Sequence, residues 1–275
     1  MEADPRRGGC GVSLAHCRAL VEAGDPDRAL VTRGAGADRL WPVWALNLEV
    51  ARAPWATREP MVAEIRLQFW ADSLAALAAG ERVAGHPVLE ALAASLPGEA
   101  MPGEAMPGLA PELAAVLAEV VEARRQDCWR APFADPAALW AYLEGTGGAL
   151  SWAAARVLGA PPEAEAVARD MGSGAALAAW LRALPVLEAQ GWAALPAGTD
   201  VAALARAGLD RIARARAGRA HVPGAAFAAL AAGWQAPGIL RRAARAPARV
   251  AEGRLQPSEF ARRGGLFWAG LTGRW

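Results

Sequence analysis

The chain has 275 residues, of which 54% are apolar, so it is long enough to bury one large helical core or two smaller ones. No window of about 18 apolar residues is free of charges, Pro and repeated Gly, which argues against a transmembrane helix. Residues 1–20 contain no long apolar core after the arginines, so we expect no cleaved secretory signal.

The formal net charge is only +1, but the charges are unevenly distributed along the chain. All 29 basic residues are arginine. Residues 201–275 hold 13 Arg and three acidic residues, a charge of +10, which leaves 16 Arg against 25 acidic residues, or −9, for residues 1–200. Such a basic end indicates an acidic partner, an anionic membrane surface or nucleic acid. Since no nucleic-acid-binding motif accompanies the arginines, we expect no nucleic-acid partner.

The cysteines are odd in number and fit no metal-binding spacing. They are Cys10, Cys17 and Cys128. Reduced thiols in a cytoplasmic protein are therefore expected. The three histidines stand alone in the sequence, without a second ligand at a useful spacing, so they predict no metal site.

The sequence predicts an all-α fold, because alanine-rich windows with helical spacing occur throughout and period-two runs of β-branched residues do not. Residues 1–11 are rich in Gly, Arg and Pro, and we expect them to be disordered. A single helical domain is expected over residues 12–275. Its first helix is predicted over Leu14–Ala23, where a Gly-Asp-Pro stop signal follows.

Two helices joined by a short loop are predicted between about Asp38 and Leu77, where apolar residues recur with helical spacing. The first helix ends before Pro54, because proline cannot continue a hydrogen-bonded helix interior. Thr57 is the predicted cap of the second helix, and Pro60 fits its first turn.

Further helices are expected downstream. Asp135 followed by Pro136 is a strong start signal, and the glycines of residues 145–148 either interrupt that helix or let another backbone approach closely. Residues 97–106 repeat Pro-Gly-Glu-Ala-Met twice, which indicates a duplicated surface loop. The other predicted helices are Pro87–Ser95, Leu113–Asp127, a segment ending at Leu158, Glu163–Leu184 and Asp200–Arg216, with residues 220–275 less regular.

Several segments, in a fixed order, resemble the squalene/phytoene synthase family, and within it a short branch similar to the assembly factors of respiratory complex I. They are NLEVAR (47–52), EPMVAEIRLQFW (59–70), HPVLEAL (86–92), EARRQD (122–127), APFADPAALWAYLEGTGGAL (131–150) and AARVLGA (154–160). The resemblance implies an isoprenoid-synthase-like helical bundle around a central cavity.

Members of this family join two prenyl diphosphates head to head, with two aspartate-rich motifs that hold Mg²⁺ against the diphosphates. Mg²⁺ prefers oxygen ligands, so the carboxylates need to share a helix face. Where the first motif is expected, this chain has Glu49-Val-Ala-Arg52. Where the second is expected, it keeps Arg182 but has Ala183 and Leu187 at the aspartate positions.

The resemblance and these departures together imply a catalytically inactive family member, without catalytic residues, metal ligands or a cofactor. Such a protein would bind a complex I subunit or an isoprenoid-like lipid. The alternative is an active prenyl transferase, in which Glu49, Glu64 or Asp72 would serve the Mg²⁺. A third possibility is a membrane-surface scaffold.

The residues expected to line the cavity are Asn47, Glu49, Arg52, Glu64, Gln68, Asp72, Tyr142, Thr146 and Arg182. Each group also has a purely structural interpretation. Glu64, Gln68 and Asp72 lie four residues apart and would equally form a solvated helix edge. Glu49 and Arg52 would equally form a local ion pair. Helix packing through small residues would explain the glycines beside Thr146.

Contact with a membrane or a partner is predicted for the basic C-terminal part, at Trp234, Arg241, Arg242, Arg245 and Arg249. Cationic side chains beside an apolar stretch that contains Trp suit the headgroup zone of an anionic bilayer. Such contact would make the protein peripheral to the inner membrane. An ordinary solvated arginine surface is the alternative interpretation.

Overall fold

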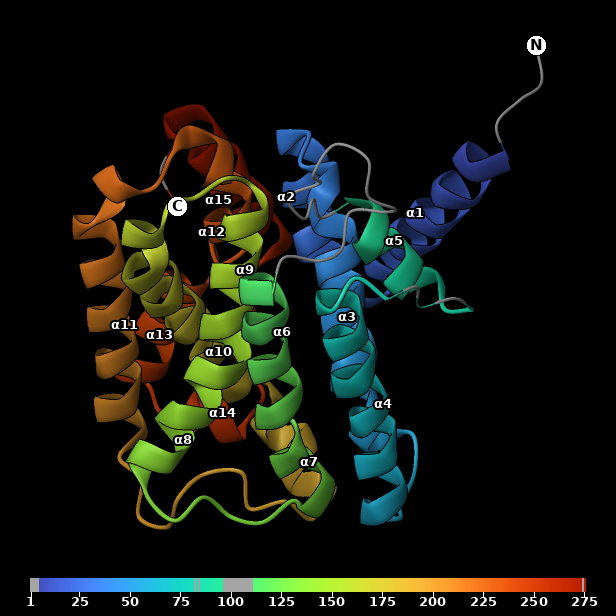
Figure 1. Ribbon diagram of the computed structural model, residues 1–275. Coiled ribbons are helices and arrows are strands. Elements are labelled where there is room, and N and C mark those ends of the chain that lie inside the picture. Colours follow the sequence, from blue (N-terminus) through green and yellow to red (C-terminus); the bar gives the residue numbers. More distant parts are fainter. Residues whose placement is uncertain (1–4, 82, 84, 96–110, 274) are drawn as a thin grey trace. The chain divides into compact units, whose positions relative to one another are not determined.

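The structure, a computed structural model, describes residues 5–81, 83, 85–95, 111–273 and 275, and of residues 5–11 and 95 only the backbone. Within this part every regular element is a helix, which confirms the predicted all-α class (Figure 1). None of the described helices is both long enough and apolar enough to cross a membrane. The repeated segment of residues 97–106 lies outside the described residues.

The contacts divide the chain into two compact units. The first unit comprises the described residues up to 128 together with 156–158, and the second comprises 129–155 and those from 159 onward. The single domain expected over residues 12–275 stays a prediction.

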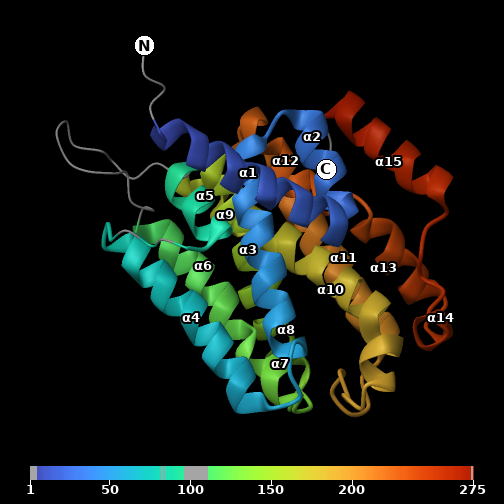
Figure 2. The ribbon, with the colours of Figure 1, turned by 90° about the vertical axis from the view of Figure 1, so that its right-hand side faces the viewer.

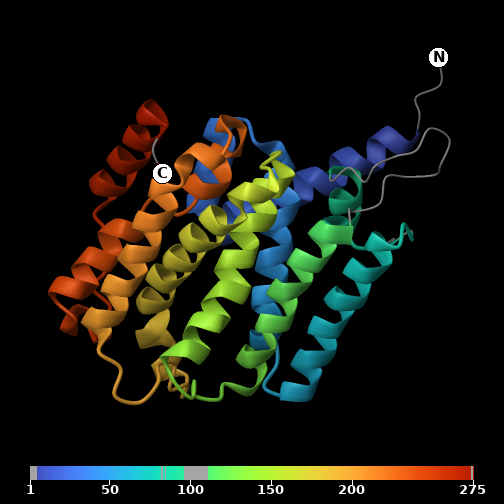
Figure 3. The ribbon, with the colours of Figure 1, turned by 60° about the vertical axis from the view of Figure 1, so that its left-hand side comes forward.

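The first unit is built around α3, whose buried face includes Trp41, Trp44 and Leu46. Helix α1 packs against α3 and α5, and α4 packs against α6, beside which it lies in Figures 2 and 3. The Trp44 indole donates a hydrogen bond of 3.0 Å to the Thr32 hydroxyl, which ties α3 to α2. The helices are α1 (Pro5–Gly24), α2 (Pro26–Ala35), α3 (Trp41–Arg52), α4 (Pro60–Ala78), α5 (Pro87–Ser95), α6 (Pro111–Ala123) and α7 (Arg125–Trp129).

Two details of this unit differ from the predictions. Helix α1 begins at Pro5, so the backbone of residues 5–11 is helical where disorder was expected; proline fits a first turn because the N–H that it lacks has no helical partner there. Thr57 does not cap α4, because the cap residue is Glu59. The Thr57 hydroxyl instead accepts the Glu59 N–H at 3.1 Å in the turn before the helix.

The second unit is built around α10, the longest helix, which packs against α11, α13 and the turn η3 (Figures 2 and 3). Asp135 and Asp200 cap α8 and α11 with their carboxylates, as the sequence indicated. The helices are α8 (Pro136–Leu143), α9 (Ala149–Val157), α10 (Glu165–Ala189), α11 (Val201–Ala217), α12 (Phe227–Ala231), α13 (Ala236–Arg245), α14 (Ala248–Ala251) and α15 (Glu259–Thr272).

The glycine cluster forms η3 (Glu144–Gly148), a π-helical turn that joins α8 to α9. Both predicted roles of the cluster are therefore combined, since the regular helix is interrupted and a backbone approaches closely. A Cβ atom on Gly147 would lie 2.7 Å from the main-chain oxygen of Gly172 on α10. Only glycine allows the two backbones to approach this closely.

Helix α10 was expected to end at Leu184, before Pro185. It continues to Ala189 with Pro185 inside it. Proline removes one helical hydrogen bond and is disfavoured in a helix interior. The buried side chains of Leu184 and Leu187 on either side keep the last turn packed, so tertiary packing overrides the local preference here.

Candidate functional site

Helix α3 presents the residues that replace the first aspartate-rich motif. Asn47 is buried, Glu49 is half-buried and Arg52 is exposed. The structure does not pair Glu49 with Arg52: the Arg52 guanidinium lies against Gly24 at the end of α1, where a Cβ would be 2.7 Å from Nη2. Glu49 instead lies near His86, since its charge acts on the pKa of that histidine.

His86 is a half-buried imidazole, which the sequence placed only among three isolated histidines without a metal-ligand spacing. Burial lowers its pKa below the ordinary value, and the negative charge of Glu49 opposes this effect. Its ring packs edge-on against Trp70, with centroids 4.7 Å apart. No group in the described part of the chain forms a hydrogen bond with its Nδ1. The imidazole therefore lies against an aromatic ring and near the charge of Glu49.

Helix α4 carries Glu64, Gln68 and Asp72 along one edge, and α7 supplies a partner for Gln68. Gln68 donates to Asp72 at 2.7 Å and accepts from Arg125 at 2.6 Å. Burial raises the pKa of Cys128, and the charge of Glu64 adds to this effect. Gln68 and Asp72 are exposed, so this set forms a polar edge rather than a closed pocket.

The EARRQD segment completes this edge in a way that the sequence analysis missed. Arg125 also donates to Glu122 at 2.8 Å, and Arg124 donates to the buried Asp127 at 2.9 Å. The signal available in the sequence was the pair of arginines at 124 and 125 with an acid three residues before Arg125 and another three residues after Arg124.

In the second unit, Tyr142 lies in a cluster of four aromatic rings. The Tyr142 ring is 5.0 Å from Trp180 and 5.4 Å from Phe133, and Trp180 is 5.1 Å from Trp192. The indole N–H groups donate to the main-chain oxygens of Ala194 and Ala131. All four rings are buried, so the cluster forms part of the packed core of the second unit. That Tyr142 lines a cavity stays a prediction.

Thr146 and Arg182, the other candidates of this unit, have different surroundings. The Thr146 hydroxyl donates to the main-chain oxygen of Tyr142 at 2.7 Å and is satisfied within its own helix. Arg182 lies about 200° around α10 from Trp180, so it points away from the aromatic cluster. Its Nε atom is buried and has no hydrogen-bond partner among the described residues.

Ala183 and Leu187 occupy the positions where the resemblance to the family predicts aspartates. Leu187 is only 8% exposed, and Trp180 lies about two turns earlier on the same side of α10. Among the residues that the structure describes, no three His, Cys, Asp or Glu side chains are grouped so that they could hold a metal ion. The donor set around α10 therefore does not fit a Mg²⁺–diphosphate site of the kind that the resemblance implies.

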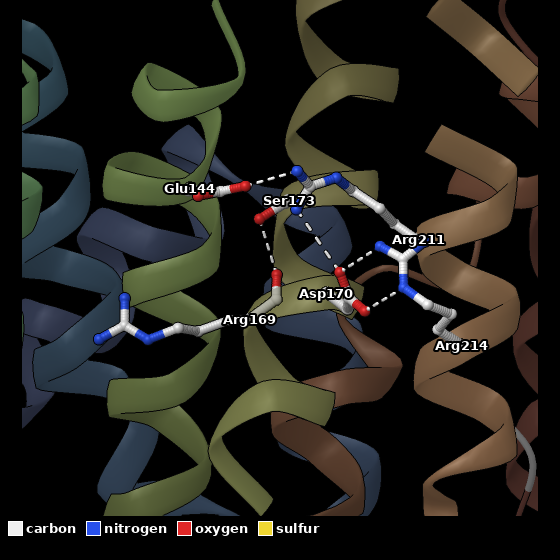
Figure 4. A network of polar contacts seen from close by, with 6 residues as sticks. All are labelled: Glu144, Arg169, Asp170, Ser173, Arg211 and Arg214. Carbon is white, nitrogen blue, oxygen red and sulfur yellow. Dashed lines mark hydrogen bonds and ion pairs between the residues drawn. The ribbon is translucent and has the colours of Figure 1, made fainter. Parts of the chain in front are cut away.

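A second polar network, which the sequence analysis also missed, links three elements of the second unit (Figure 4). Arg211 on α11 binds Glu144 of η3 at 2.5 Å and Asp170 of α10 at 3.5 Å, and Arg214 binds Asp170 at 2.9 Å. The Arg211 guanidinium also lies over the Trp140 ring, 4.2 Å from its centroid. The hydrogen bonds that Arg214 donates to the Asp170 carboxylate raise the pKa of Arg214. The network joins η3, α10 and α11.

The predicted basic contact residues lie on and around α13. Arg241, Arg245 and Arg249 are exposed. Arg242 is half-buried, and burial, with the charges of Arg249 and Arg241, lowers its pKa. Trp234 donates to the main-chain oxygen of Arg262 at 3.2 Å. It lines a groove of about 460 Å³ together with residues of α11 and α15.

The helical architecture defines a protein of the isoprenoid-synthase-like class. A crystal structure of a dehydrosqualene synthase in complex with ligand matches 98% of this chain and 99% of its own, with a TM-score of 0.76 and 14% identity. The squalene synthase HpnC from Alicyclobacillus acidocaldarius matches 86% of this chain and 94% of its own, with a TM-score of 0.64 and 16% identity.

The family model for squalene/phytoene synthase matches residues 23–256, and this chain belongs to the squalene/phytoene synthase family. No curated protein matches the chain. The resemblance to the complex I assembly factors stays a prediction.

Proposed function

We propose that this protein binds a lipid with a long apolar chain, or a protein subunit, and does not condense two prenyl diphosphates. The observation that supports the proposal is the end of α10, where Ala183 and Leu187 replace the family's aspartates. Leu187 is buried on the aromatic side of the helix. A carboxylate in that position would lose its hydration without a partner to compensate it.

Arg182 is the candidate group for the anionic head of such a lipid. Its buried Nε has no hydrogen-bond partner within the described residues. A guanidinium binds phosphate oxygens in a planar, often bidentate geometry, so a phosphate or diphosphate headgroup would satisfy this atom. The ligand class that follows is an amphiphile with a phosphate-containing head.

A diphosphate-release assay tests the catalytic part of the proposal. With farnesyl or geranylgeranyl diphosphate and Mg²⁺, we expect no release of diphosphate beyond that in EDTA, while an active synthase run in parallel releases it. Metal-dependent release by this protein that is lost in Glu49→Gln or Asp72→Asn would establish the alternative, an active prenyl transferase.

Equilibrium dialysis with geranylgeranyl diphosphate in EDTA tests the binding part. A hydrogen bond to a charged group contributes about 1.5–3 kcal/mol, so Arg182→Gln is expected to weaken binding by about tenfold or more. Arg66→Gln, on the exposed side of α4, is the matched control and should leave binding unchanged. Equal binding by wild type and Arg182→Gln would remove Arg182 from the proposal.

For the protein-binding form, the resemblance to the short branch suggests a subunit of respiratory complex I. Co-purification of complex I subunits with the tagged protein from solubilised membranes is the expected result. A preparation that contains none of these subunits would count against this partner.

A further inference from the structure

Helix α15 presents an apolar face that remains exposed. Phe260 is 91% exposed, Phe267 72%, Trp268 62% and Leu271 68%. These positions are spaced by 7, 8 and 11 residues from the first and therefore share one side of the helix. Contiguous exposed apolar side chains of this size mark a contact site for a protein or a membrane.

The opposite side of α15 holds the helix on the second unit. Ala269 is buried, and the main-chain oxygen of Arg262 accepts the Trp234 indole N–H. The Arg216 Nε donates to the main-chain oxygen of Trp275 at 2.8 Å, and Arg219 donates to that of Gly273 at 3.3 Å. Figures 2 and 3 show α15 at the outside of the second unit. The apolar face of α15 is thus exposed, while the opposite side of the helix contacts the second unit.

The groove beside α15 combines cationic and aromatic side chains. Arg216 and Arg219 lie on one wall, and the rings of Trp234, Trp268 and Trp275 line the remainder. A guanidinium has five N–H donors, and the main-chain contacts above engage one nitrogen of each arginine. Burial, with the charge of Arg241, lowers the pKa of Arg216, so an anion here would relieve an unfavourable charge.

The surrounding charges favour an anionic occupant. Arg263 and Arg254 are 76% and 69% exposed along their side chains. The three acidic residues of 201–275 are accompanied by arginines: Glu259 binds Arg262 and Arg263, Glu252 binds Arg254, and Asp210 acts on Arg214. Since residues 201–275 hold 13 Arg and only three acidic residues, the region stays positively charged after this pairing.

A bilayer fits these features better than a single soluble anion, because the apolar face needs an apolar partner. At 1.5 Å per residue the 14 residues of α15 extend about 21 Å, which is shorter than the roughly 30 Å of a hydrocarbon core. Such a helix lies in the plane of the membrane interface, where Trp is enriched at headgroup level.

We propose that α15 and the adjacent groove form a docking surface for an anionic phospholipid bilayer. Phe260, Phe267, Trp268 and Leu271 enter the boundary between headgroups and acyl chains, and Arg216 and Arg219 bind a lipid phosphate in the groove. This surface differs from the one predicted on Arg241 to Arg249, with which it shares only Trp234. It does not depend on whether the protein condenses prenyl diphosphates.

Vesicle co-sedimentation of the full chain tests the proposal. Vesicles of phosphatidylcholine alone are compared with vesicles that contain 30% phosphatidylglycerol, at low and high salt. We expect binding to the anionic vesicles, weakened by salt because exposed charges are screened. Phe267→Ser with Leu271→Ser should weaken binding by about tenfold for each side chain. Arg216→Gln with Arg219→Gln should weaken it about fivefold for each arginine, and only on anionic vesicles.

Matched controls lie on the first unit. Met61→Ser with Ile65→Ser removes two comparably exposed apolar side chains of α4, and Arg58→Gln with Arg66→Gln removes two exposed charges. Neither pair should change vesicle binding. Circular dichroism checks that each variant is folded.

Three results would overturn the proposal. They are no binding of the wild type to anionic vesicles, equal binding by wild type and the α15 variant, and equal losses in the α4 controls. Displacement of the protein from vesicles by an acidic peptide that binds α15 more tightly would assign the face to a protein partner instead. None of these results affects the diphosphate-release assay, so the two proposals fail separately.

Discussion

At the scale of single residues, the replacement of two aspartates by Ala183 and Leu187 differs in its consequences at the two positions. Ala183 is partly accessible, whereas Leu187 is buried beside the turn that leads to Trp192, whose N–H donates to the Leu187 main-chain oxygen at 3.1 Å. A charge is tolerated only where water can reach it. The two positions are therefore not equivalent, although the sequence pattern treats them alike.

We expect Leu187→Asp to lower the free energy of unfolding by about 2–5 kcal/mol, because it buries an unpaired carboxylate. Ala183→Asp should cost less than about 1 kcal/mol. Urea unfolding followed by circular dichroism measures both. Leu187→Met controls for the change in shape and should be nearly neutral. A Leu187→Asp protein as stable as Ala183→Asp would show that water reaches the end of α10.

At the scale of elements, the second unit depends on close crossings of α10. Gly172 and Gly147 allow η3 to approach α10, and Gly174 does the same for α11, where its Cβ would lie 2.6 Å from Ile212. The network of Arg211, Glu144 and Asp170 then joins the same three elements at their polar side. The close backbone contacts and the ion pairs therefore stabilise the same packing of η3, α10 and α11.

Gly147→Ala should separate η3 from α10, since the new methyl group would meet a backbone oxygen that cannot rotate away. We expect a loss of about 1–3 kcal/mol, the range for overpacked cores, seen as a lower thermal midpoint. Gly34→Ala on α2 is the control, because a Cβ there has nothing within 4 Å. It should be neutral or slightly stabilising. An unchanged midpoint for Gly147→Ala would mean that the crossing can relax.

At the scale of the whole molecule, the absence of lysine simplifies the alkaline titration. Burial raises the pKa of Cys17 to about 12 and that of Cys128 to about 11, from an ordinary value near 9. Between these values the unfolded chain has lost thiol protons that the folded chain retains. Stability is therefore fully present below about pH 9 and decreases as the pH rises toward the folded pKa values.

Each buried thiol should contribute a slope of up to about 1.4 kcal/mol per pH unit above pH 9. Urea unfolding at intervals from pH 8 to 11 measures the slope. Cys17→Ala lowers stability at every pH through the lost packing, but it should also flatten the slope by about half. A slope that is the same in Cys17→Ala would assign the alkaline loss to other groups.

Much of the helical fold was predictable, because caps and prolines act locally. Asp135 and Asp200 cap their helices as expected, and Pro54 lies beyond the end of α3. Pro185 was misread, since its tolerance depends on packing that is distant in sequence. The network of Arg211 and Asp170 was missed for the same reason: its members are 41 residues apart, and no local pattern connects them.

The candidate site was predictable only in part. The absence of the family's aspartates at Ala183 and Leu187 is visible in the sequence. The hydrogen bond between Arg125 and Gln68 is not, because the two residues are 57 positions apart. The exposed apolar side of α15 was not predicted, because glycines separate its large residues and weaken the helical pattern in the sequence. Which side is exposed follows from the contacts of Arg216 and Arg219 with the end of the chain.

The aromatic cluster around Trp180 also gives the second unit an optical signature. The indoles of Trp180 and Trp192 lie 5.1 Å apart with their planes nearly perpendicular, at 86°. Chromophores held this closely in a fixed, asymmetric geometry couple their excited states and produce a strong near-ultraviolet circular dichroism band, which vanishes when specific packing is lost. The molecule therefore carries its own spectroscopic reporter at the end of the helix where the family's carboxylates are missing.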